Sequence, residues 1–379
     1  MTDLQRPFIP GLDLSELLYR QAVQPILARH FPGLVTSAGL LGFGSEVLGF
    51  DTSQSMDHDW GPRLQLFLSE SDYPLYREEI ERVLRLELPG QIQGYPIDMA
   101  SREERLPGSG PNPAHHGIQL TTIQQFFRGA VKVDLREELS ALNWVLIPQQ
   151  QLRSVTAGRV FCDDLGELEP ARARLRYYPH DVWLYLLAAQ WMRISQEEHF
   201  MGRCGQVGDD LGSRLIAARL VRDLMNLGFL MERQYAPYIK WFGTAFSRLR
   251  CASDLKPLLE ATLAAATWQE RQKPLAEAYE HAARMHNALG ITEPLSVQAT
   301  PFYERPFLVI WGERFAAAIR QAIHDPQVLA LPEHLGGVDQ YIDSTDAYNY
   351  LNDSMEKIKG AFMSSRVRPA DAPYQATSP

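Results

Sequence analysis

The chain has 379 residues, enough for two or three domains with substantial hydrophobic cores. Its residues are 45% hydrophobic and 22% charged, which is typical of globular proteins and excludes a disordered or fibrous chain. The net charge is −9, from 37 Lys and Arg against 46 Asp and Glu, and this balance disfavours a dedicated binder of duplex DNA or of anionic membranes. The composition therefore favours a small molecule, a nucleotide or a protein as partner.

The three cysteines, Cys162, Cys204 and Cys251, lie far apart and form no C-x-x-C pair, so neither a disulfide framework nor a structural zinc site is expected. The N-terminus lacks a basic start followed by an apolar stretch. The longest apolar run, residues 182–192, is about two thirds of the length that spans a bilayer. We therefore expect a cytoplasmic protein with no membrane partner.

The first half of the chain mixes helical and strand patterns. Apolar residues at helical spacing predict helices over residues 14–31 and 73–88, each ended by a Pro-Gly pair. Alternating apolar residues predict strands over residues 60–68, 91–99 and 116–122. The Pro- and Gly-rich segment between the last two strands predicts a loop.

The second half has a helical period almost throughout. This period covers residues 181–199, 209–233, 236–250, 254–289, 306–324 and 341–362. The turn-rich residues 161–179 precede it and mark a boundary. We expect the α+β class, with a small mixed-sheet domain over residues 1–160, an all-helical domain over residues 161–363 and a loose tail over residues 364–379.

The most informative segment combines a Gly-Ser turn, Gly44-Ser45, with two aspartates further along, Asp57 and Asp59. If the aspartates enter a strand, their side chains project from the same face and converge. Two close carboxylates repel each other unless a cation neutralises them, and such hard oxygen ligands suit Mg²⁺. Because Gly44 has no side chain, backbone N–H groups of the turn can approach phosphate oxygens. The combination predicts phosphoryl or nucleotidyl chemistry.

Each part of this pattern also has an ordinary structural interpretation. An isolated D-x-D is often a solvated turn or a helix cap, and an isolated Gly-Ser is often only a loop. A P-loop would need a lysine directly after Gly44, and a dinucleotide-binding loop would need a glycine in place of Val47. A nucleophile elbow would need a residue between Gly44 and Ser45. A His-Asp phosphohydrolase around His58-Asp59 would need that pair on a helix, whereas the pair precedes an expected strand.

Gly44-Ser45 followed by Asp57-x-Asp59 resembles the signature of the polymerase-beta-type nucleotidyltransferase superfamily, which includes the kanamycin and lincosamide nucleotidyltransferases. The core likeness covers residues 35–125. Longer patterns resemble an uncharacterised bacterial branch that carries a C-terminal helical domain: G-S-E-x-x-G-F-D at residues 44–51, D-H-D-W-G-P at residues 57–62, Tyr177-Tyr178-Pro179, and Tyr235-x-Pro237-x-x-Lys240-Trp241.

The resemblance implies a mixed sheet on which Asp57 and Asp59 bind two Mg²⁺ ions while Gly44 and Ser45 hold the distal phosphates of a nucleoside triphosphate. It implies an enzyme, a magnesium-dependent nucleotidyltransferase, with its active site in the cleft between the two domains. The reaction moves a nucleoside monophosphate, with AMP from ATP favoured, to a hydroxyl of a small molecule or protein and releases pyrophosphate. A catalytically degenerate nucleotide-binding or regulatory protein of the same fold is the alternative, and an unrelated interaction module would bind no nucleotide. Nucleic acid is disfavoured as a partner.

Members of this superfamily usually place a third catalytic carboxylate on a neighbouring strand. The best candidate here is Asp98, which stands between two hydrophobic residues, although a turn aspartate after a proline is an equally good interpretation. The strand expected over residues 116–122 offers Gln119, a neutral ligand. Asp134 is a weaker candidate, because such a residue more often begins a helix.

Four residues of the helical half are candidates for contact with the triphosphate or the base: Arg203, Arg214, Tyr235 and Lys240. Basic residues on helices are mostly solvated surface, and an aromatic residue at helical spacing is more often part of the core. Lys240 is the strongest of the four because aromatic residues and a proline surround it in the sequence. The adjacent His115 and His116 would point to opposite faces of a strand, so they are not expected to share a metal ion.

Overall fold

The computed structural model describes residues 7–56, 60–99, 115–333, 335–342, 344 and 360. These residues form two compact units. The first contains the described parts of Met1–Glu138 and Gln151–Arg176, and the second contains those of Leu139–Gln150 and Tyr177–Pro379. None of the helices in these described ranges is long and apolar enough to cross a membrane.

A four-stranded mixed sheet lies at the centre of the first unit. Its order is β5-β2-β1-β6, formed by β1 (Ser37–Leu40), β2 (Arg63–Leu68), β5 (Gly117–Thr122) and β6 (Arg159–Asp163). β2 is parallel to β5, whereas β1 is antiparallel to both β2 and β6. The mixed sheet predicted from the sequence is therefore confirmed. β6 spans the boundary expected at residue 160, and the first unit continues to Arg176.

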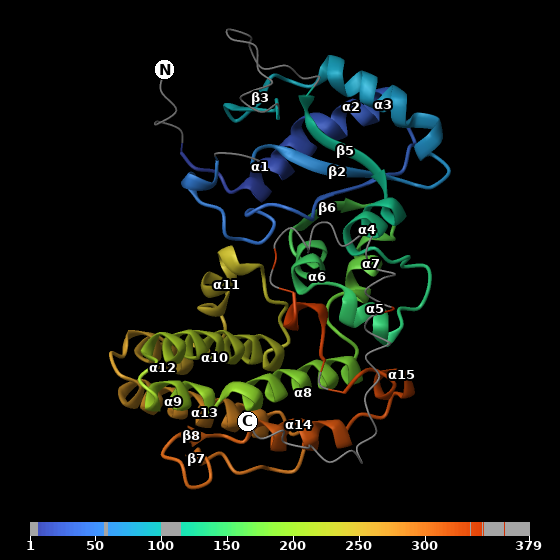
Figure 1. The fold of residues 1–379 in the computed structure, drawn as a ribbon. Helices are drawn as coiled ribbons and strands as arrows, with labels where there is room; N and C mark the ends of the chain where they lie inside the picture. The colour runs from blue at the N-terminus through green and yellow to red at the C-terminus, as the bar shows by residue number, and fades with distance from the viewer. Residues whose placement is uncertain are drawn as a thin grey trace. The chain divides into compact units, whose positions relative to one another are not determined.

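Helices cover the face of this sheet to which the even-numbered residues of β2 point (Figure 1). They are α1 (Gly11–Leu18), α2 (Gln24–His30) and α3 (Tyr73–Glu87), and they share one buried core with Leu64, Leu66 and Leu68. On the odd-numbered side, the ring of Phe67 lies edge-on to that of Phe126, at 5.5 Å between centroids. Phe126 belongs to α4 (Ile123–Val131), which directly follows β5. The period-2 pattern of β2 thus separates two hydrophobic layers.

The helix predicted over residues 14–31 is present but not uniform. A π-helical stretch, Tyr19–Val23, joins α1 to α2. Pro25 stands in the first turn of α2 and has no N–H to donate, so the regular hydrogen-bond ladder cannot run through this point. The helix predicted over residues 73–88 is confirmed as α3.

The strand predicted over residues 91–99 is instead a short hairpin. β3 (Gln91–Ile92) pairs antiparallel with β4 (Tyr95–Pro96). The turn between them uses Gln93 at φ 50° and Gly94 at φ 81°, a pair of positive φ values that suits a tight hairpin turn. Beyond β4, Asp98 forms an isolated antiparallel bridge with His116. The loop expected at residues 107–113 lies outside the described residues. The turn-rich residues 161–179 contain the end of β6 and also α7 (Leu168–Arg174).

The second unit is largely helical (Figure 1). Helix α8 is its centre, with nearly every residue from Val182 to Trp191 buried, and it packs against α10 and α14. The Trp191 ring stacks on Phe315 of α14 at 4.3 Å between centroids. The elements of this unit are α5 (Ala141–Leu146), α8 (His180–Glu197), α9 (Phe200–Gln206), α10 (Asp210–Met231), α11 (Ile239–Phe246), α12 (Ala252–Ala264), α13 (Trp268–Ala288), the hairpin of β7 (Thr300–Pro301) and β8 (Leu308–Val309), α14 (Gly312–Gln321) and α15 (Pro326–Leu329). Helix α6 (Gln149–Thr156) contributes its first two residues here and the rest to the first unit.

Two parts of the helical prediction need correction. The period over residues 254–289 belongs to two helices, because α12 ends at Ala264 and Thr267 begins α13 with a capping box to Glu270. The period over residues 306–324 also starts too early, since β8 precedes α14 and Trp311 adopts a left-handed φ of 59°. The helix expected over residues 341–362 and the tail over residues 364–379 lie almost entirely outside the described residues. The α+β class is confirmed.

Candidate functional site

Three segments of the chain meet at one edge of the four-stranded sheet. In the antiparallel pair, Gly39 lies opposite Gln65, so the turn that follows β1 is beside the start of β2. In the parallel pair, Arg63 lies opposite Gly117, so β5 starts at the same edge. The bridge between Asp98 and His116 then adds the Asp98 segment beside the start of β5. The Gly-Ser turn, the chain entering β2 and Asp98 therefore occupy one edge.

The Gly-Ser turn is held by several hydrogen bonds. The side chain of Gln65 accepts from the backbone N–H of Leu41 at 3.0 Å and donates to its carbonyl at 3.2 Å. Gly42 donates its N–H to the carbonyl of Ser154 at 2.9 Å, and the carbonyl of Ser45 accepts from the N–H of Phe50 at 2.8 Å. A buried amide side chain on β2 thus fixes the point at which the turn leaves the sheet.

A buried ion pair lies against this turn. The guanidinium of Arg63 donates from Nε and Nη2 to Oε1 of Glu46, at 2.9 and 2.6 Å, and Nη2 also donates to the carbonyl of Phe43. Gly44 has a φ of 129°, and a Cβ there would overlap Nη2 of Arg63 and the carboxylate of Glu46. The missing side chain of Gly44 therefore makes room for a guanidinium.

The pair is unequal in its exposure. The side chain of Glu46 is 1% exposed and that of Arg63 is 18% exposed. Burial raises the pKa of the Glu46 carboxyl, although the charge of Arg63 acts in the opposite direction. Its second oxygen, Oε2, is buried and accepts no hydrogen bond from the described part of the chain. On the other partner, Nη1 of Arg63 makes no hydrogen bond within the described ranges and keeps two N–H groups for a ligand.

A second acidic residue near the turn, Asp51, connects the start of α1 to Trp60 by hydrogen bonds. Oδ2 of Asp51 accepts from the backbone N–H of Gly11 at 2.8 Å and from Nε1 of Trp60 at 3.2 Å. A Cβ on Gly11 would lie 2.7 Å from Cβ of Glu46 and 2.8 Å from Nε1 of Trp60. The start of α1 therefore packs directly on Glu46 and on Trp60, the residue that follows Asp59. These contacts give Asp51 and Trp60 a structural role.

Asp57 and Asp59 lie outside the described residues, and the described chain resumes at Trp60. Asp98 is 5% exposed. Its neighbour Met99 packs against the chain entering β2, because a Cβ on Gly61 would lie 3.1 Å from Sδ of Met99. Asp98 is thus on a segment that contacts the residues just after Asp59. Within the described ranges, no group of three or more His, Cys, Asp or Glu side chains could hold a metal ion.

The other two candidates for the third position have different surroundings. Gln119 is exposed on β5, opposite Gln65 in the strand register. Asp134 pairs with Arg136 and Arg128, and the hydrogen bonds from Arg136 hold the pKa of Asp134 well below its usual range. A carboxylate paired in this way has a sufficient structural explanation.

The four candidates of the helical half have different surroundings. Arg203 and Lys240 are exposed, and Nζ of Lys240 lies 5.2 Å from the centroid of its neighbour, Trp241. Arg214 is also exposed, with hydrogen bonds to Asp210 at 2.7 Å and to a backbone carbonyl at 2.9 Å. The fourth, Tyr235, is buried.

Tyr235 belongs to an aromatic cluster within the second unit. Its ring is 5.1 Å from those of both Tyr177 and Tyr178, and burial raises the pKa of its hydroxyl.

In the first unit, the side chain of His116 is buried and burial lowers its pKa, whereas His115 is exposed. The two adjacent histidines thus lie in different environments.

Sequence reasoning missed Arg63, Glu46 and Gln65. Glu46 directly follows the turn, and Arg63 and Gln65 alternate with the leucines of β2, so the period-2 pattern predicts the latter two on an exposed face. The sequence gives no local signal that these three side chains are buried.

A family model described as a domain of unknown function (DUF4037) matches residues 144–242, which is less than half of the chain. Among solved structures, a nucleotidyltransferase-like protein from Exiguobacterium sibiricum 255-15 is similar over 75% of this chain and 82% of its own, at 10% sequence identity. Its TM-score is 0.29, which is too low to carry a conclusion about this chain. No curated protein matches.

Proposed function

We propose that the chain is a magnesium-dependent nucleotidyltransferase that moves a nucleoside monophosphate, AMP from ATP in the favoured case, to a hydroxyl of a small molecule or protein with release of pyrophosphate. The observation that supports this proposal is the meeting of the Gly-Ser turn, the entry to β2 and Asp98 at one sheet edge. A site for this chemistry needs acidic ligands and a phosphate-binding turn to converge in this way.

In this proposal, Asp57 and Asp59 hold Mg²⁺ and Asp98 supplies the third carboxylate. Carboxylate oxygens are the donors that Mg²⁺ prefers, and the burial of Asp98 at 5% exposure makes a nearby cation favourable to it. Bound Mg²⁺ would neutralise charge on the phosphates. Gly44 and Ser45 would position the distal phosphates through backbone N–H groups.

Arg63 adds a group that the sequence reasoning lacked. Its Glu46 partner holds the guanidinium beside Gly44 through Nε and Nη2, which leaves Nη1 as a donor for an anionic oxygen. A guanidinium fixed in this way acts as a preorganised cation, because no side-chain reorganisation is needed when the phosphate arrives. Arg63 is thus proposed to help Gly44 and Ser45 bind triphosphate.

The test is the double variant Asp57→Asn with Asp59→Asn, assayed for release of pyrophosphate from ATP with and without Mg²⁺ in the presence of cell extract as a source of acceptors. We expect turnover to be lost while the melting temperature is unchanged. Glu78→Gln, an exposed change on α3, is the matched control and should keep activity. Unchanged turnover in the aspartate variant would reject the proposal. ATP binding without pyrophosphate release by the wild type would favour the degenerate nucleotide-binding protein instead.

A further inference from the structure

The second unit contains an open hollow of its own. Its volume is ≈550 Å³, counted out to the solvent at its mouth. Apolar residues of the segment that leads into α11 line part of it, and polar side chains from α6, α10 and the turn at Val338–Gln340 line the rest. Its lining includes Arg222, Asn226, Pro237, Ile239, Phe242 and Asp339. A smaller hollow adjoins it and shares Gln149, Asn226 and Asp339. Mixed walls of this kind are typical of small-molecule sites.

Asp339 is the acidic group of this hollow. Its Oδ2 accepts the backbone N–H of Gln149 at 3.0 Å. Besides Gln149, its own backbone N–H and the charge of Arg222 act on the carboxylate, and no other described residue donates a hydrogen bond to its Oδ1. Arg222 lines the same hollow and already has an interaction of its own. Asp339 therefore offers a carboxylate oxygen to a donor that the described chain does not supply.

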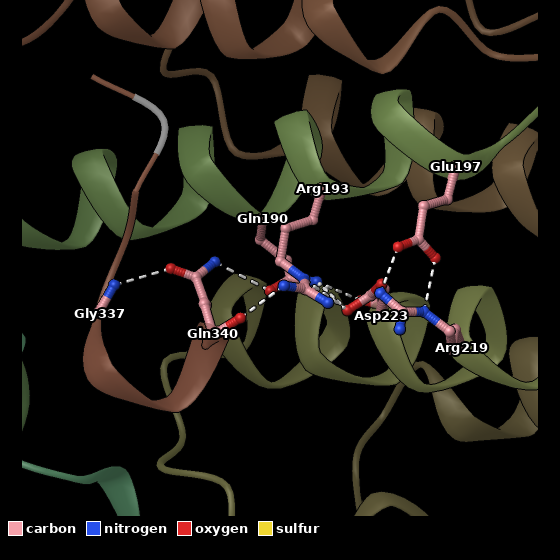
Figure 2. A network of polar contacts seen from close by, with 7 residues as sticks. All are labelled: Gln190, Arg193, Glu197, Arg219, Asp223, Gly337 and Gln340. Atoms are coloured by element: carbon pink, nitrogen blue, oxygen red, sulfur yellow. Dashed lines mark hydrogen bonds and ion pairs between the residues drawn. The ribbon is translucent and has the colours of Figure 1, made fainter. Parts of the chain in front are cut away.

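Side chains of α8 anchor the turn that carries Asp339 (Figure 2). The N–H of Gly337 donates to Oε1 of Gln340 at 2.8 Å, and Nε2 of Gln340 donates to Oε1 of Gln190 at 3.0 Å. Arg193 donates to the carbonyl of Gln340 and reaches Oδ1 of Asp223 at 3.3 Å. Helix α8 thus fixes the turn directly, and Asp223 of α10 holds the α8 side chains in place, so the carboxylate of Asp339 is positioned before a ligand arrives.

Two glutamines of α6 hold the segment that leads into α11 by hydrogen bonds to its backbone. Oε1 of Gln149 accepts from the N–H of Ala236 and Oε1 of Gln150 accepts from that of Tyr238, each at 3.0 Å. Because the oxygens are occupied, the amide nitrogens of both glutamines are left as donors. They can bind a hydroxyl or carbonyl oxygen of a ligand, but they repel an ammonium group. The carboxylate is therefore the acceptor suited to a cation in this hollow.

We propose that this hollow binds a small amine, with an ammonium or guanidinium group paired to Asp339 and an apolar body against Pro237, Ile239 and Phe242. Ile239 is 64% exposed, and such a ligand would cover it. A cation paired with a carboxylate in a partly buried site gains more than the same group does in water. The inference goes beyond the proposed transferase activity, because it concerns residues of the second unit alone.

Burial raises the pKa of Asp339 to about 7, and Arg222 pulls that pKa down. Two tyrosine hydroxyls, those of Tyr178 and Tyr341, also interact electrostatically with this carboxyl. Binding should therefore be measured near pH 8, where Asp339 is ionised, the tyrosines are neutral and an alkyl ammonium keeps its charge.

The test compares three probes of the same shape by calorimetry on the full chain: phenethylamine, phenethyl alcohol and phenylacetate. We expect phenethylamine to bind about tenfold tighter than the alcohol, the usual advantage of a charge-assisted hydrogen bond, and phenylacetate to bind weakest. Asp339→Asn should remove the preference for the amine, whereas Asp254→Asn, an exposed acid of α12, should keep it. The Asp57→Asn with Asp59→Asn variant should also keep it, which separates this inference from the proposed activity.

Four results would overturn the inference. Phenethyl alcohol could bind as tightly as the amine, or phenylacetate could bind best, which would indicate an anion site at Arg222. Asp339→Asn could retain the amine preference. Finally, phenethylamine could show no saturable binding. If Asp339→Asn does not fold, the ranking of the three probes on the wild-type protein decides the question alone.

Discussion

Replacing Arg63 with methionine would leave the Glu46 carboxylate buried without its counter-charge. Methionine keeps much of the volume of the arginine stem, so little packing is lost. Removing one partner of a buried ion pair costs about 3–5 kcal/mol. Because the side chain of Arg63 is 18% exposed, we expect the lower end of this range, about 3 kcal/mol.

The second change, Glu46→Gln, tests the cause of that loss. An amide needs no counter-charge, so Arg63→Met with Glu46→Gln should be more stable than Arg63→Met alone by about 2 kcal/mol. The pair would thus show strong non-additivity, as expected for side chains in direct contact.

The loss of stability in Arg63→Met should also depend on pH. Burial already raises the pKa of Glu46 in the folded protein, and removing Arg63 raises it further. An acid whose folded pKa is above its unfolded value binds protons more tightly when folded, so its contribution to stability is lost as pH rises. Arg63→Met should therefore be more destabilised at pH 8 than at pH 5.

Hydrogen exchange measured by mass spectrometry on peptides covering β1 and β2 gives the opening free energy of the first unit separately from the second. Equal protection of these peptides in Arg63→Met and in the wild type at pH 8 would refute this role of the ion pair. So would a loss of stability in Arg63→Met that is the same at pH 5 and pH 8, or a double variant that is no more stable than Arg63→Met.

Two further predictions concern single residues. Gly44→Ala should destabilise the first unit by about 2–3 kcal/mol, because Gly44 has a φ of 129° and an added Cβ would overlap Arg63 and Glu46. The control, Gly33→Ala, should cost only about 1 kcal/mol, because Gly33 has a φ of 87° but no atom within 4 Å of an added Cβ. Equal losses of stability in thermal unfolding would contradict the overlap at Gly44. Burial raises the pKa of Glu198 to about 7, so protonation of this group stabilises the folded state below that pH. Glu198→Gln should therefore make the free energy of unfolding in urea less dependent on pH. The wild type should lose at most about 3 kcal/mol between pH 5 and 8 through this group, and an unchanged slope in the variant would refute the assignment.

Helix α3 shows what the sequence predicts well. Its local period and its tertiary burial agree, because Ile80, Val83 and Leu84 face the core while the opposite side carries ion pairs such as Arg85 with Glu81. The division of residues 254–289 shows where the same reasoning fails. Alanines keep the apolar period running through the turn, and only the capping box at Thr267 marks the new helix.

The residues of the candidate site that belong to local sequence patterns were predictable, whereas those that depend on strand pairing were not. Gly44, Ser45 and Asp98 could be selected from residue type and local order, whereas the contact of Arg63 with Glu46 depends on how β1 and β2 pair. These two residues are 17 positions apart, and no short pattern specifies that they meet. The roles of Gly44, Ser45, Asp57, Asp59 and Asp98 stay predictions.

The burial of α8 on nearly all sides has a consequence for the stretch that the family model detects. Residues 144–242 include α8 but not α14, whose Phe315 stacks on Trp191. They also lack Pro332, whose carbonyl accepts from the hydroxyl of Tyr185 at 2.8 Å. A fragment cut at these limits would keep α10 against α8 but would expose the apolar side of α8 that packs on α14. We therefore expect this fragment to aggregate when it is expressed without residues 243–342.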